Sequence, residues 1–238
     1  MTDNGGRARR RAGRELMPLG ADHVAELPSP CVACLFWEHG PAASATADGA
    51  PAGATPSVTP KQAWIRAVTA EWAPPGRVID INGRIAGYVS YAPAPFSPRT
   101  LAFPTAPIAE DALALFAIRV RGRYAGQGLG RVLIQTACKD ALQHGYRAIE
   151  AFGAHRPPVT MHGCVVSAGF LSAVGFETVR DHPAYPRMRL DLRAAVGWRE
   201  DVENALGRLL APIRGLGQQS PVGTSHHDIS RETHGGRA

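Results

Sequence analysis

The sequence lacks long apolar runs, is poor in cysteine and carries no secretory leader pattern. No run of roughly 18 apolar residues exists, so we expect no membrane-spanning helix and no membrane partner. The 4 cysteines are too few and too scattered to form a disulfide scaffold in a chain of 238 residues. The first residues, MTDNGGRARRRAGREL, contain arginines but no apolar segment of a signal peptide. These absences predict a cytoplasmic protein.

Composition predicts one folded domain between polar ends. With 45% hydrophobic residues, the chain can bury one sizeable core, which we assign to residues 15–210. This domain includes an Ala-, Gly- and Pro-rich loop at 40–60 and a last helix at 198–210. The basic arm 1–14 and the tail 211–238 have few large apolar side chains, and we expect both to be disordered.

The formal net charge of +6 lies largely on the basic arm, where five arginines accompany one acid. No aromatic residue stands between these arginines to stack on bases, so we favour a solvated arm over a nucleic-acid partner. An enzyme that uses this arm to modify something bound to nucleic acid is kept as an alternative. A homodimer is also left open.

Hydrophobic periodicity and turn residues predict a mixed order of strands and helices. The clearest hairpin is centred on Asn82-Gly83, which supplies the positive φ angles of a tight type I′ turn. The region of Asp22 is expected to cap a short helix. The predicted strands are 15–19, 77–81, 84–91, 113–120, 147–152, 177–179 and 187–192, and the predicted helices are 21–27, 60–72, 129–144, 166–174 and 198–210.

One phosphate-binding pattern follows the buried strand at 113–120. Gly126, Gly128 and Gly130 alternate with other residues at the start of the next helix. Glycines allow the backbone to turn tightly and to approach a ligand, and the first N–H groups of a helix favour an anion. The pattern therefore predicts a pyrophosphate site.

Other phosphate loops fit this segment less well. A P-loop needs Lys followed by Ser or Thr where Arg131 and Val132 stand, which argues against hydrolysis of a nucleoside triphosphate. A dinucleotide loop would place an acid near Glu150, but the third glycine comes one position early. Glycines kept for packing alone are the remaining alternative.

The segment VRGRYAGQGLG, from Val120 to Gly130, resembles the strand end and pyrophosphate loop of the GNAT superfamily of acyl-CoA-dependent N-acetyltransferases. The hairpin before it and GFLSAVGFETV, which ends at Val179, are also similar to that family. Ala125 stands where the family usually has Arg or Gln. The segments CVACLFWE and HPAYPRMRLDL look like an actinobacterial subgroup of unassigned substrate. The resemblance spans roughly 15–192 and implies an α/β (α+β) fold in which helices flank a mixed central sheet with splayed middle strands.

The resemblance implies an N-acetyltransferase that passes an acetyl group from acetyl-CoA to an amine acceptor by direct attack. The alternative is a catalytically weak acyl-CoA-binding protein that regulates or senses, because Ala125 and Leu171 replace residues that the family usually has. Leu171 stands where a tyrosine is the usual general acid. The residues that the resemblance assigns to the cofactor are Ile118, Arg119, Val120, Gly126, Gln127, Gly128, Leu129, Gly130 and Arg131.

Candidate catalytic residues are less well defined. As general bases we consider Glu150, which is expected to end its strand beside the splayed gap, and Glu38, in the region that borders the acceptor in this family. Tyr185 is our candidate acid, and His155, His162 and Cys164 are other local candidates.

A metal site is the last candidate. Cys31 and Cys34 form a single CxxC, which is half of a structural zinc site. Cys164 and His162 would complete four ligands if the fold brings them together. We favour reduced, partly buried thiols over zinc.

Overall fold

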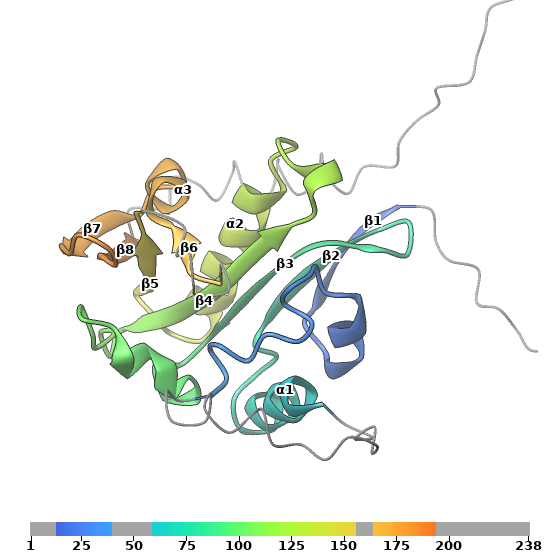
Figure 1. The fold of residues 1–238 in the computed structure, drawn as a ribbon, viewed down its shortest axis with the longest axis horizontal. Coiled ribbons are helices and arrows are strands. Elements are labelled where there is room, and N and C mark those ends of the chain that lie inside the picture. The colour runs from blue at the N-terminus through green and yellow to red at the C-terminus, as the bar shows by residue number, and fades with distance from the viewer. Residues whose placement is uncertain (1–12, 40–58, 156–163, 194–238) are drawn as a thin grey trace, which may run out of the picture.

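Eight strands of the computed structural model form one mixed sheet, in the order β1-β2-β3-β4-β5-β8-β7, with β6 paired to β5 (Figure 1). The structure describes residues 13–39, 59–155 and 164–193. The predictions for the basic arm, most of the 40–60 loop, the 198–210 helix, the tail and His162 therefore lie outside the described residues, apart from the arm's last two residues and the loop's last two.

The strands are β1 (Arg14–Pro18), β2 (Gly76–Ile81), β3 (Ile85–Ala92), β4 (Ala112–Val120), β5 (Ala148–Ala154), β6 (Val166–Ser167), β7 (Glu177–Arg180) and β8 (Arg187–Asp191). The α-helices are α1 (Pro60–Glu71), α2 (Leu129–Gln143) and α3 (Ala168–Ala173). Short 3₁₀ turns are η1 (Ala21–Glu26), η4 (Ala94–Phe96), η5 (Pro98–Ala102) and η6 (Gly122–Tyr124).

Two apolar cores lie on opposite faces of the sheet. One core joins α2 and α3 to side chains such as Leu113, Leu115 and Ile149. The other joins η1, α1 and the loops around them to side chains such as Val78, Tyr88 and Phe116. The helices consequently cover both faces, with α2 and α3 on one side and α1 on the other (Figure 1). This is the mixed, helix-flanked sheet that the sequence predicts.

The middle strands β4 and β5 separate along their second halves, which leaves a gap in the sheet. They are parallel and pair from Ala112–Ala148 to Leu115–Ala151. Beyond that point β4 continues to Val120 beside β3, while β5 continues to Ala154 beside β6. The second half of β4 therefore has one edge that no described strand pairs. The predicted splay of the middle strands is confirmed.

The predicted hairpin turn is also confirmed. Asn82 and Gly83 have φ angles of 56° and 76°, as a type I′ turn requires. Asp80 Oδ1 accepts a hydrogen bond from the Gly83 N–H at 2.6 Å, which fixes the turn.

Three local predictions need correction. The 21–27 helix is the 3₁₀ turn η1 with Gly20 as its N-cap, and it stops before Leu27 because residues that precede a proline avoid helical angles. The 166–174 helix begins only at Ala168, because Val166 and Ser167 pair with β5. Glu150 does not end its strand, since β5 continues to Ala154.

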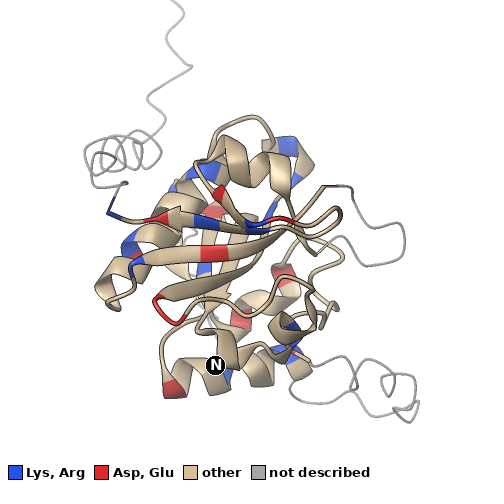
Figure 2. Ribbon diagram, turned by 90° about the vertical axis from the view of Figure 1, so that its left-hand side faces the viewer, with Lys and Arg blue, Asp and Glu red and all other residues tan. Residues whose placement is uncertain are grey.

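Within the described ranges, none of the helices has the length and apolar character needed to cross a membrane. Basic and acidic residues are interspersed over the strands and helices that Figure 2 shows.

Candidate functional site

The glycine turn at the start of α2 has the geometry of an anion site. Gly126 and Gly128 have φ angles of 73° and 77°, in the left-handed region that favours glycine. A Cβ built on either residue meets no heavy atom within 4 Å among its described neighbours, so the turn faces open space. Gly128 is the N-cap of α2 and offers no side chain to bind the first N–H groups of the helix. These N–H groups and the helix dipole point toward that space.

A groove of about 340 Å³ runs between the unpaired edge of β4 and the segment that contains β6 and α3. Its volume is in the range of pockets that hold small molecules and cofactors. The lining includes Ile118, Arg119 and Val120, three of the residues that the resemblance assigns to the cofactor. The other lining residues are Gly130, Cys164, Val165, Val166, Ser167 and Phe170.

The remaining residues assigned to the cofactor surround the turn. Leu129 is buried in the core, so only its main chain can face a ligand. The absence of a side chain at Gly130 lets α2 approach α3, because a Cβ there would lie 3.1 Å from the Phe170 ring. The Arg131 guanidinium donates a hydrogen bond to the Ala173 carbonyl at 3.0 Å and so ties α2 to α3. The Gln127 amide donates to the Arg123 carbonyl at 3.4 Å.

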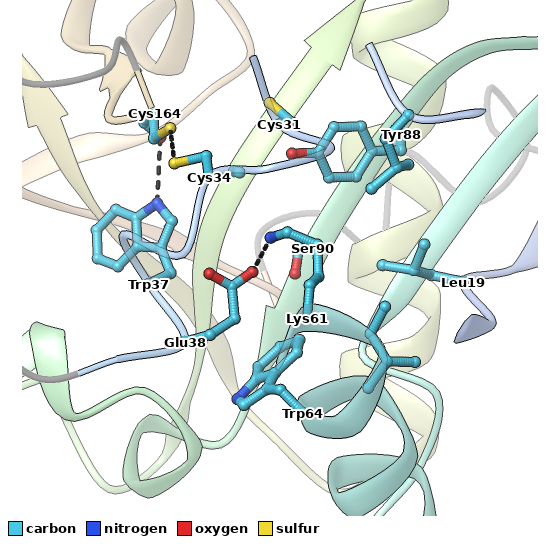
Figure 3. Close-up of a pocket in the computed structure, with 13 residues that line it drawn as sticks. Leu19, Cys31, Cys34, Trp37, Glu38, Lys61, Trp64, Tyr88, Ser90 and Cys164 are labelled. Carbon is cyan, nitrogen blue, oxygen red and sulfur yellow. Dashed lines mark hydrogen bonds and ion pairs between the residues drawn. The ribbon is translucent and has the colours of Figure 1, made fainter. Parts of the chain in front are cut away.

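A small cavity of about 20 Å³ lies next to this groove, and Cys164 lines both (Figure 3). Glu38 and Lys61 form an ion pair in its wall, with side chains 7% and 9% exposed. A buried carboxylate needs such a partner to keep its charge. The other polar groups of the lining are Cys31, Cys34, Trp37, Trp64, Tyr88 and Ser90.

Aromatic packing holds the segment that carries Glu38. The Trp37 ring stacks on Phe103 and Phe116 with centroids 5.4 Å and 5.8 Å away, and Phe36 packs edge-on against it at 5.0 Å. Trp37 Nε1 also donates to the Cys164 carbonyl at 3.2 Å. Core filling and pocket lining are therefore both roles of Trp37.

Three cysteines meet in the cavity wall. Cys34 Sγ and Cys164 Sγ lie 2.8 Å apart, and Cys31 is hydrogen-bonded to Cys164 and to Tyr88. A hydrogen bond from Cys164 lowers the pKa of Cys31 to about 6 and that of Cys34 to about 7. The same contacts raise the pKa of Cys164. The fold therefore brings Cys164 to the CxxC, but among the described residues no cluster of His, Cys, Asp and Glu fits a metal ion.

The other two catalytic candidates lie away from these hollows. Glu150 is 2% exposed and accepts hydrogen bonds from Arg189 Nη1 at 3.1 Å and the Ala109 N–H at 3.0 Å. Arg187 Nη1 forms an ion pair with it at 3.4 Å. The ring of Tyr185 packs edge-on against Phe103 with centroids 5.5 Å apart. Neither Glu150 nor Tyr185 is among the lining residues of the groove or the cavity.

The sequence did not reveal the role of Lys61 or the burial of Leu171. Lys61 lies in the first turn of α1 among polar residues, and only the fold reveals that it is buried against Glu38. Leu171 is fully buried in the α2–α3 core, so the position of the usual tyrosine is filled by packing here.

Solved structures and family profiles provide an independent comparison. An N-acetyltransferase from Staphylococcus aureus is 14% identical, with 75% of this chain and 98% of that chain covered at a TM-score of 0.45. PaiA N-acetyltransferase from Thermoplasma acidophilum, solved with coenzyme A, is 10% identical, with coverage of 75% and 98% and a TM-score of 0.44. Ard1 from Thermoplasma volcanium is 10% identical, with coverage of 75% and 97% and a TM-score of 0.44. No curated protein sequence matches the chain.

The profile of the Acetyltransferase (GNAT) family matches residues 35–159, which is 125 of the 238 residues and includes β4, the glycine turn and α2. The chain therefore belongs to the GNAT family of acetyltransferases.

Proposed function

We propose that the protein transfers an acetyl group from acetyl-CoA to an amine by direct attack. The observation that carries this proposal is the groove between β4 and β6, which leads to an uncapped helix N-terminus at the glycine turn. A pyrophosphate at one end and a thioester arm along a strand edge are the two parts of acetyl-CoA that such a groove can hold. The family match supports the same donor.

The donor would bind mainly through main-chain groups. The N–H groups from Gly126 to Arg131 would hold the pyrophosphate, and the pantetheine arm would lie along Ile118, Arg119 and Val120. The acetyl group would then point toward Cys164, where the groove meets the cavity. Since the glycines keep the backbone open, Ala125 removes a side-chain contact to phosphate without closing the turn.

The acceptor amine would enter from the side of Glu38. We assign the role of proton acceptor to this carboxylate because it lines the cavity next to the groove, where its partner is the Lys61 ammonium. The neutral amine attacks the thioester carbonyl, and an N–H of β4 stabilises the oxyanion. The C–S bond then breaks and CoA leaves as a thiolate that water protonates. Glu150 would instead serve stability, because two arginines and a main-chain N–H hold it.

An acyl-CoA sensor is the second candidate. It is motivated by Leu171, which places an apolar side chain where the family usually has a hydroxyl group, and by the small volume of the cavity. It predicts binding of acetyl-CoA without transfer to any amine.

Calorimetry with acetyl-CoA and a thiol-release assay over a panel of amines would test the proposal. We expect binding and turnover in the wild type, and in Glu38→Gln a fall in kcat of about a hundredfold with unchanged affinity for acetyl-CoA. Glu177→Gln, on the exposed strand β7, is the matched control and should keep full activity. Binding without turnover would favour the sensor, and absence of binding would contradict both readings.

A further inference from the structure

The cluster of Cys31, Cys34 and Cys164 is not used by the proposed transfer reaction. It joins two segments that are 130 residues apart in sequence, the loop before Trp37 and the segment before β6 (Figure 3). The fourth cysteine, Cys138, lies in α2 on the other face of the sheet and is part of the other core. The chain thus has three thiols in one place and one separate thiol.

Two sulfur atoms of the cluster are already close to bonding distance. Cys34 Sγ and Cys164 Sγ lie 2.8 Å apart, whereas a disulfide bond is about 2.05 Å long. The two atoms need to approach by less than about 1 Å. Neither residue lies within a helix or strand, so no main-chain ladder opposes this small shift.

The environment of the cluster favours a thiolate at neutral pH. Hydrogen bonding with Cys164 lowers the pKa of both Cys31 and Cys34, and Lys61 adds a favourable charge. Arg119 acts in the same direction on Cys31, whereas Glu38 opposes the effect at Cys34. The thiolate is the form of cysteine that reacts with oxidants.

The cavity admits only a small oxidant. Its volume of about 20 Å³ exceeds the roughly 10–15 Å³ that one water molecule needs on the same measure, and hydrogen peroxide is little larger than water. Cys34 is also half-buried rather than enclosed, which leaves a route from solvent. Cys31 and Cys164 are buried behind it.

We propose that Cys34 and Cys164 are a redox-modification site that hydrogen peroxide converts to a reversible disulfide. The Cys34 thiolate attacks one peroxide oxygen, the O–O bond breaks, and Cys34 becomes a sulfenic acid as hydroxide leaves. The Cys164 sulfur then attacks the Cys34 sulfur, its proton passes to the departing oxygen, and the S–O bond breaks to release water. Two thiols have lost two electrons, and one peroxide has been reduced.

Cys31 has a supporting role. Its thiolate accepts the hydrogen bond from Cys164 and lies on the same cavity. Because it is more buried than Cys34, it reacts with peroxide more slowly, and the Cys34–Cys164 bond forms without it.

Thiol titration and peptide mapping by mass spectrometry would test this site without reference to acetyl transfer. After treatment of the full chain with hydrogen peroxide, the wild type should lose two of its 4 thiols, and dithiothreitol should restore them. The mapped linkage should join Cys34 to Cys164. Cys138→Ser should behave like the wild type, and Cys31→Ser should still form the bond.

Cys34→Ser and Cys164→Ser should each abolish the reversible loss of a thiol pair. Mapping of the wild type tests the proposal even if one of these variants fails to fold. The proposal is overturned if the wild type keeps all its thiols, if the mapped bond includes Cys31 or Cys138, or if the purified protein holds a metal that blocks oxidation. Failure here leaves the proposed transfer reaction intact, since that reaction uses none of these thiols.

Discussion

Gly128 is the residue on which the proposed donor site depends. Its φ angle of 77° is matched by Gly145, at the other end of α2, which has a φ angle of 81° and is equally open to a Cβ. A side chain costs about 1–2 kcal/mol in this conformation, so Gly128→Val and Gly145→Val should lose similar stability in urea. Only Gly128→Val places a side chain in the proposed pyrophosphate site.

We therefore predict that Gly128→Val weakens binding of acetyl-CoA by at least about tenfold, or 1.4 kcal/mol, whereas Gly145→Val leaves it unchanged. Isothermal titration calorimetry measures both. Equal affinities in the two variants would mean that the glycine turn does not hold the pyrophosphate.

Ala125 offers a test in the opposite direction. It is exposed at the edge of the turn, and the resemblance suggests that a long side chain fits there. We predict that Ala125→Arg raises the affinity for acetyl-CoA by up to about tenfold, because charge-assisted hydrogen bonds to phosphate contribute roughly 1.5–3 kcal/mol before ordering costs. The gain should shrink with added salt in the same titration. Ala125→Gln is the uncharged control.

The thiols of Cys31 and Cys34 are expected to lose their protons at a lower pH than an ordinary cysteine thiol. The pKa values of about 6 for Cys31 and about 7 for Cys34 are depressed, so their thiolates form as the pH rises through that range. We predict that alkylation of the half-buried Cys34 by iodoacetamide rises as the pH passes through about 7 and then levels off. Cys138, whose pKa burial raises to about 12, should stay unreactive.

The variant Cys164→Ala removes the hydrogen-bonding partner that lowers the pKa of the other two thiols. The midpoint of alkylation should then move up toward the ordinary cysteine pKa of about 8.5. An unchanged midpoint would show that charge, rather than this hydrogen bond, lowers the pKa values.

At the scale of single residues, sequence predicted what is local and missed what is not. The glycines of the turn and Asn82-Gly83 are recognisable because each encodes its own backbone angle. The partner of Glu38 is not recognisable, since Lys61 is 23 residues away and nothing in its surroundings marks it as buried. Glu150 looked exposed to a ligand because its arginine partners lie 37 and 39 residues later, on β8.

At the scale of elements, one buried network joins α2 to the hairpin. Asp140 of α2 accepts two hydrogen bonds from Arg77 of β2, at 2.7 Å and 2.9 Å, and a further one from the Tyr91 hydroxyl of β3. Its side chain is 8% exposed. The network fixes the end of α2 that lies opposite the glycine turn, and so helps to set the direction in which the helix N-terminus points.

We predict that Asp140→Asn lowers the free energy of unfolding by about 3 kcal/mol, because removing one partner of a buried pair leaves the other charge uncompensated. Tyr91→Phe should cost only about 1 kcal/mol. Urea denaturation measures both. The control Asp22→Asn changes a carboxylate whose side chain is 82% exposed and should cost less than about 1 kcal/mol. A loss at Asp140 as small as that control would contradict a structural role for the network.

Helices and strands could be predicted where the local sequence pattern alone indicates the element and its length. The α2 helix has a hydrophobic periodicity, β4 is a continuous apolar run and Asn82-Gly83 marks the hairpin, and the bounds of these elements differ from the predictions by one residue at most. The two-residue strand β6 was missed because it exists only through pairing with β5, which no local pattern encodes. The same pairing shortens α3 and forms the far wall of the groove.

At the scale of the whole molecule, a ligand that binds only the folded chain must stabilise it. Acetyl-CoA at a hundred times its dissociation constant should add about 2.7 kcal/mol. For a protein of this size, each kcal/mol raises the melting temperature by roughly 2–4 °C, so we predict a rise of about 5–10 °C in differential scanning calorimetry. Coenzyme A should give nearly the same rise, because it carries the same pyrophosphate, whereas pantetheine should give much less.

Two variants of this experiment separate the functions that the sequence left open. Deleting residues 1–12, which leaves β1 intact, should leave the rise unchanged, and a smaller rise would give the basic arm a role in binding the donor. Glu38→Gln should keep the rise and lose transfer, since it lines the cavity rather than the groove. We expect Gly128→Val to abolish the rise in melting temperature and Glu38→Gln to preserve it. This result would divide the site into a donor part made of main chain and an acceptor part made of side chains.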